Sequence, residues 1–151
     1  MRIAWMLGLV LAGGMVQAQS TQDVLQLNRE AIETQKNFIV SGSMELTEQE
    51  SQAFWPLYNQ YQVPLRAANA RADALVVRYV DAYHTLNDVE AQQILNEWVA
   101  IEEERLRLKK TYMQKMAKAL PVRKVVRYFQ LENKMDAIFD YDLSQRIPLA
   151  R

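Results

Sequence analysis

Residues 46–83 read LTEQESQAFWPLYNQYQVPLRAANARADALVVRYVDAY, and their pattern indicates the architecture of the chain. Its apolar positions recur every three or four residues, at Phe54, Tyr58, Tyr61, Leu65, Ala68, Ala72, Leu75, Tyr79 and Tyr83. That spacing places them on one face of an α-helix. Pro56 and Pro64 each remove a backbone hydrogen bond, but the stripe stays in phase through both. We therefore expect one long, bent helix.

Similar short motifs stand at the start of this helix and at the start of the next one. In each, a leucine precedes a residue that can cap a helix, and a glutamate follows three residues after the cap. Such a pair forms a capping box, in which the cap side chain and the glutamate each accept a hydrogen bond from the other's backbone. The motifs either only start helices or are also functional signatures, and their residues are Leu46, Thr47, Glu50, Leu86, Asn87 and Glu90.

Three more helices are predicted, one of which forms a hairpin with the helix over residues 46–83. The helix after Asn87 carries a packing stripe of Ile94, Trp98, Ile101, Leu108, Tyr112, Met116 and Ala119. Pro121 suits the first position of a fourth helix that runs to about residue 144. A first helix covers about residues 23–40, and Ser41-Gly42-Ser43 is its expected stop. The sequence thus predicts an elongated, bent hairpin with flanking N- and C-terminal helices.

Glycine and cysteine usage support an all-α fold. Three of the four glycines lie within the first 14 residues, which leaves Gly42 alone in the rest of the chain. A β-rich domain would need more glycine for its turns. Cysteine is absent, so disulfides and thiol chemistry are excluded and stability must come from packing.

A secretory leader is predicted at the start of the chain. Arg2 is followed by an apolar run over residues 3–12 and by small residues at the −3 and −1 positions before a cleavage site after Ala18. The run is shorter than the roughly 20 residues that a membrane span needs. We expect a signal peptide at residues 1–18 and one helical domain at residues 19–151, exported, with no transmembrane span. There it would meet neither ATP nor nucleic acid.

Charge and site chemistry exclude several function classes. Residues 19–151 carry 17 basic and 18 acidic side chains, a formal charge of −1, which gives no global case for a polyanion partner. No nucleophile with a base, phosphate-binding loop or metal-ligand spacing is recognisable. His84 is the one histidine, and it suits the C-terminal end of a helix. We expect no enzyme activity, no cofactor and no metal site.

The predicted hairpin resembles two groups of exported helical proteins. The paired motifs at Leu46 and Leu86 look like those of the Spy/CpxP group of periplasmic stress proteins, over about residues 45–120, with Glu50, Asn87 and Glu90 as departures from the Leu-Thr-x-x-Gln pattern. A closer resemblance, over about residues 44–149, is to exported proteins of mostly unknown role. It rests on Leu-Thr-x-x-Glu, Phe54-Trp55-Pro56-Leu57-Tyr58, Leu120-Pro121, Phe129-Gln130-Leu131-Glu132-Asn133-Lys134 and Ile147-Pro148-Leu149.

The resemblance implies a function as well as a fold. It implies a bent helical dimer in the periplasm that binds unfolded or envelope proteins without ATP. The resulting hypothesis is a non-enzymatic periplasmic chaperone or envelope-stress accessory protein. The alternatives are a metal- or signal-sensing domain of an envelope stress system and a structural dimer.

An aromatic cluster is the first candidate client surface. It comprises Phe54, Trp55, Tyr58 and Tyr61. Such a stripe more often packs in a core, and this alternative stays open. Trp55 lies about 100° from Phe54 around the helix, so it is expected to stand off the main stripe.

A basic run is the second candidate surface. Residues 105–127 hold nine basic side chains and no acidic one. The run either forms a solvated face that suits the C-terminal dipole of the third helix, or attracts acidic clients or anionic lipid head groups. Arg105, Lys109 and Arg127 are the candidate contacts.

The fourth predicted helix suggests a homodimer. It carries Val122, Val126 and Phe129 on one face, and Val125, Tyr128, Leu131, Met135 and Ile138 on another. Helices about 50 Å long make a thin hairpin with few internal partners. Surplus apolar surface of this kind usually pairs with a second copy.

Overall fold

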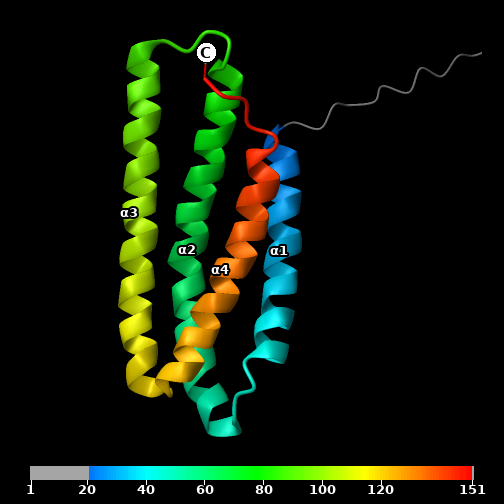
Figure 1. The fold of residues 1–151 in the computed structure, drawn as a ribbon, viewed down its shortest axis with the longest axis vertical. Helices are drawn as coiled ribbons and strands as arrows, with labels where there is room; N and C mark the ends of the chain where they lie inside the picture. Colours follow the sequence, from blue (N-terminus) through cyan, green and yellow to red (C-terminus); the bar gives the residue numbers. More distant parts are fainter. Residues whose placement is uncertain (1–20, 151) are drawn as a thin grey trace, which may run out of the picture.

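The computed structural model describes residues 21–150 as four α-helices and no strand in that range (Figure 1). They are α1 (Thr21–Ser43), α2 (Glu48–Ala82), α3 (Asp88–Ala119) and α4 (Val122–Ser144). The all-α prediction with four helices is confirmed. The predicted leader at residues 1–18 lies outside the described residues.

The α2–α3 hairpin is the frame of the molecule. α2 continues through Pro56 and Pro64 without a break, as its in-phase apolar stripe predicted. Its 35 residues extend about 52 Å at 1.5 Å per residue. α3 returns antiparallel along it, and this pair makes the most extensive helix contact in the described chain.

α1 and α4 cover the hairpin unequally. The four helices alternate in direction, and α4 begins beside the end of α3 but finishes beside the start of α1 (Figure 1). It therefore crosses the bundle at a slant and leaves α3 as it proceeds. As a result, the N-terminal half of α3 packs on α2 without cover from α4.

The core lies at the end of the bundle where α3 passes into α4. Val40 of α1 and Met44, directly after α1, belong to it, and α2 contributes Leu65 and aromatic side chains from its first half. α3, α4 and the short link between them supply the remaining buried members, Leu108, Met116, Leu120, Val125, Tyr128, Phe129 and Met135. All four segments meet at one end, so the opposite end is more loosely covered.

Two predicted helix ends differ from the structure. α1 does not stop at Gly42 but runs through Ser43, and the backbone NH of Met44 still donates to the carbonyl of Val40 at 3.0 Å. The left-handed residue is Glu45, with φ of 51°. Burial of Val40 and Met44, one turn apart, explains the longer helix. Pro121 occupies the cap position before α4 and not its first turn.

Candidate functional site

Both predicted capping boxes are confirmed. The backbone NH of Glu50 donates to Thr47 Oγ1 at 3.2 Å, and the Thr47 NH donates to Glu50 Oε2 at 2.9 Å. Asn87 and Glu90 repeat the arrangement at 3.0 and 3.2 Å. The two boxes lie at opposite ends of α2, with Leu46 and Leu86 half-buried beside them. The structure therefore does not bring the two motifs together into one site.

The aromatic cluster is part of the core. Phe54, Tyr58 and Tyr61 are buried, and their rings meet Tyr128 of α4 at centroid distances of 5.2, 5.8 and 6.4 Å. Trp55 is half-buried against the same cluster, and its Nε1 donates to Ser51 Oγ at 3.0 Å. In this conformation, three of the four aromatic candidates offer no surface to a client.

A buried polar network joins α1, α2 and α4 beside this cluster. Gln62 Nε2 donates to Tyr128 Oη at 3.0 Å and to Glu132 Oε1 at 2.8 Å. Tyr128 Oη donates to the same carboxylate at 2.5 Å, and Lys36 Nζ pairs with its other oxygen. Burial, and next the negative charge of Glu132, raise the pKa of the Tyr128 hydroxyl. Tyr128 therefore stays protonated and serves as a donor.

The three basic candidates all have partners within the described chain. Arg105 donates to Glu102 and to Asn69, each at 2.7 Å, and so links α3 to α2. Lys109 Nζ donates to Asn133 Oδ1 of α4 at 2.9 Å. Arg127 pairs at 2.7 Å with Glu45, a residue between α1 and α2. Each thus fastens two segments together, and the solvated-face interpretation did not foresee this role.

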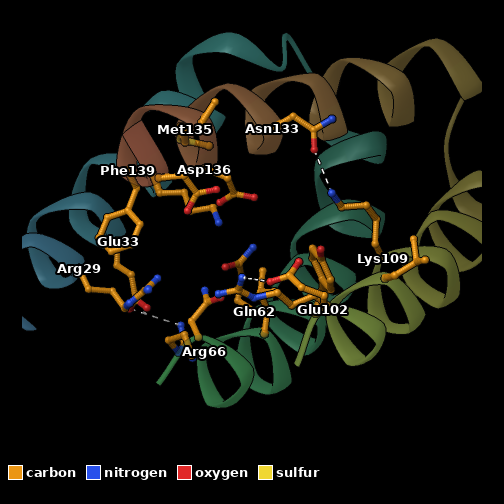
Figure 2. Close-up of a pocket in the computed structure, with 18 residues that line it drawn as sticks. Arg29, Glu33, Gln62, Arg66, Glu102, Lys109, Asn133, Met135, Asp136 and Phe139 are labelled. Atoms are coloured by element: carbon orange, nitrogen blue, oxygen red, sulfur yellow. Dashed lines mark hydrogen bonds and ion pairs between the residues drawn. The ribbon is translucent and has the colours of Figure 1, made fainter. Parts of the chain in front are cut away.

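A cavity of about 540 Å³ opens beside the polar network, and side chains from all four helices line it (Figure 2). In this view, Asp136 of α4 lies across the cavity from Arg66, Gln62 and Glu102. Lys109 and Asn133 meet at one end. Its volume is typical of ligand pockets, and both charge signs and apolar side chains contribute to the lining.

Most of the cations that line the cavity are already paired. Arg29 binds both carboxylate oxygens of Asp73, at 2.5 and 2.6 Å, and stacks over the Phe139 ring at 4.3 Å. Lys36 is held by Glu132, and Arg105 by Glu102. In contrast, no cation of the described chain lies within 4.0 Å of Asp136 or Asp140, four residues apart on α4.

An exposed apolar stripe on α3 leads into the cavity. Trp98, predicted in the packing stripe, is 54% exposed, because α4 has moved away from this part of α3. Leu95 and Val99 are also exposed, and Leu106, at 51%, lines the cavity as well. We call these four residues the α3 stripe. Spacings of three, four, seven and eleven residues put them on one side of the helix.

Sequence reasoning missed both the cavity and the α3 stripe. Leu95, Val99 and Leu106 recur at helical spacing, and this was the available signal. The signal was ambiguous because an apolar stripe can face a neighbouring helix or solvent. Only the slant of α4 decides between the two.

Three further observations concern the described chain and its likeness to known proteins. In the chain from residue 21 to residue 150, no group of three or more Asp, Glu or His side chains is placed to hold a metal ion. None of the described helices has both the length and the apolar character of a membrane span. No family model, curated protein or solved structure matches the chain, so its likeness to exported stress proteins rests on the motifs quoted above.

Proposed function

We propose that this chain is a non-enzymatic exported binding protein that holds unfolded polypeptides without ATP. The observation that carries the proposal is the α3 stripe: four large apolar side chains stay exposed beside an open cavity. Exposed patches of this kind on a folded protein usually mark an interaction surface. An unfolded polypeptide exposes the complementary apolar groups.

The energetics of such a surface suit reversible holding. Burial of apolar area contributes roughly 25 cal/mol per Å², so contact with a few side chains gives modest affinity. Part of that gain is lost to the ordering of a flexible client. A surface of four side chains would therefore delay aggregation while still releasing its client without an energy source.

The proposed location and cellular role rest on sequence features. The leader expected at residues 1–18 would direct the chain out of the cytoplasm. The capping motifs and their resemblance to periplasmic stress proteins support a role as a chaperone or envelope-stress accessory protein. Outside the cytoplasm, the protein would have to bind and release its clients without ATP.

The test is suppression of aggregation of a chemically denatured substrate, followed by light scattering at several molar ratios. We expect the parent protein to reduce scattering. A triple variant of the stripe, Trp98→Ser, Val99→Ser and Leu106→Ser, should lose most of this effect. The matched control changes one aromatic and two valine side chains that are exposed outside the stripe: Phe38→Ser, Val63→Ser and Val89→Ser.

Two results would contradict the proposal. The first is a parent protein that leaves aggregation unchanged at every ratio. The second is equal loss in the stripe variant and the control variant, since that would indicate non-specific adhesion. Because all six side chains are solvent-exposed, both variants should keep the helical circular dichroism and thermal unfolding of the parent.

A further inference from the structure

The cavity and the α3 stripe form one continuous surface. Glu102 lines the cavity, and Trp98 precedes it by four residues on the same side of α3. Leu106 belongs to both features. A polypeptide segment that lies along the α3 stripe would therefore pass over the mouth of the cavity, and one of its side chains could enter.

The charge of the cavity wall selects which side chain fits there. After the internal pairs are formed, Asp136 and Asp140 remain on the α4 wall without a cation, and Lys109 is turned toward Asn133 at one end. Partial burial, and then the neighbouring Asp136, raise the pKa of the Asp140 carboxyl, although Arg105 and Arg29, which are held by other carboxylates, act in the opposite direction from a distance. An incoming cation would offset both effects, whereas an incoming carboxylate would add a third negative charge.

The apolar part of the lining fits the stem of a long basic side chain. Leu106 on α3 and the buried Met135 and Phe139 on α4 contribute apolar surface near the two carboxylates. Lysine and arginine combine an aliphatic stem with a charged head, so they can use both kinds of surface at once. A purely apolar side chain would bury its tip next to unpaired carboxylates.

We propose that the cavity receives a lysine or arginine side chain of the bound polypeptide, between the apolar lining and the Asp136–Asp140 wall, while neighbouring apolar residues lie on the α3 stripe. This inference rests on the proposed function and narrows its client class to segments in which a basic residue is flanked by apolar ones. The ligand group is thus an alkylammonium or guanidinium carried by a polypeptide.

The experiment compares three fluorescein-labelled, unstructured peptides with the same apolar residues and with Lys, Gln or Glu at one central position. Fluorescence anisotropy gives their affinities for the parent protein. We expect the affinity to be highest for the Lys peptide, lower for the Gln peptide and lowest for the Glu peptide. The double variant Asp136→Asn and Asp140→Asn should weaken binding of the Lys peptide by about two- to fivefold, the range for exposed ion pairs, and leave binding of the Gln peptide unchanged.

The control removes the same charge elsewhere. Asp81→Asn with Glu103→Gln neutralises two exposed carboxylates outside the cavity lining. This control should change the affinities for the Lys and Gln peptides by the same factor. If the two double variants weaken the Lys peptide equally, the preference is a general charge effect and the cavity assignment is overturned.

A further arm separates a polypeptide side chain from a free amine. n-Butylamine carries the same alkylammonium group without the flanking apolar residues, so millimolar n-butylamine should not displace the Lys peptide. Full displacement would overturn the inference in favour of a small-amine site. A parent that binds the Lys and Gln peptides equally defeats this inference alone, and one that binds no peptide defeats the proposed function itself.

Discussion

Glu132 has the lowest exposure of any charged side chain in the described chain, at 1%, and it is balanced by Lys36 of α1. Its carboxylate also accepts from Gln62 and Tyr128, so both oxygens are engaged. The desolvation of such a pair costs about as much as its attraction returns. We infer that its value lies in specificity, because the two charges meet only when α1 and α4 pack in this arrangement.

We predict that removing one member of the Lys36–Glu132 pair destabilises the fold far more than removing both. Lys36→Met should lower the free energy of unfolding by about 3–5 kcal/mol, because it leaves the Glu132 carboxylate buried without a cation. The double variant Lys36→Met and Glu132→Gln should recover part of the loss. Urea unfolding measures both.

The exposed pair Arg127–Glu45 supplies the control for this cycle. Arg127→Met should cost less than about 1 kcal/mol, since water screens that pair. If the loss of stability in the Lys36→Met and Glu132→Gln double variant equals the sum of the losses in the two single variants, Lys36 and Glu132 are not coupled.

At the scale of elements, local signals predicted the helices and long-range packing decided the rest. The starts of α2 and α3 were predictable because a capping box involves residues only three apart. The unbroken α2 was predictable because its stripe keeps phase through two prolines. The exposure of Trp98 and the burial of Glu132 were not, since each depends on where α4 lies relative to helices distant in sequence.

We predict that the two caps contribute to stability independently. Thr47→Ala and Asn87→Ala should each lower the free energy of unfolding by about 1 kcal/mol, because each removes an acceptor from a first-turn NH. The two losses should add, since the boxes lie at opposite ends of α2. Thermal and urea unfolding test this.

Peptide binding by both cap variants distinguishes the two interpretations of the motifs. It should equal that of the parent if the motifs only start helices. Unchanged stability together with lost binding would instead make the motifs a contact surface.

At the scale of the whole molecule, internal packing is more complete than a bare hairpin would allow. α1 packs on α2, α4 reaches α2 through side chains such as Tyr128, and four of the eight apolar residues named on the fourth helix, Val125, Tyr128, Phe129 and Met135, are buried in the core. Ile138 and Tyr141 remain about 70% exposed on α4. These two side chains form an outward patch, separate from the cavity wall, and we propose that it is the contact of a homodimer.

We predict that α4 forms the homodimer contact through Ile138 and Tyr141. Multi-angle light scattering at micromolar concentration should give about twice the monomer mass for the parent. Ile138→Glu should give the monomer, because a charge in an apolar contact is costly to bury. Val63→Glu on α2, an exposed site off this patch, should leave the dimer intact. A monomeric parent would refute the proposal.

The slant of α4 also grades the stiffness of the molecule from one end to the other. The buried residues of α3 are Ile101, Leu108 and Met116, so none lies in its first thirteen residues. Segments with few buried contacts open at low free energy, while well-packed segments open only with the whole fold. The part of α3 that carries Leu95, Trp98 and Val99 should therefore be more easily deformed than the rest of the helix, which the core holds in place. If the proposed function holds, we expect this segment to adjust its shape to a bound polypeptide while the well-packed end keeps the fold intact.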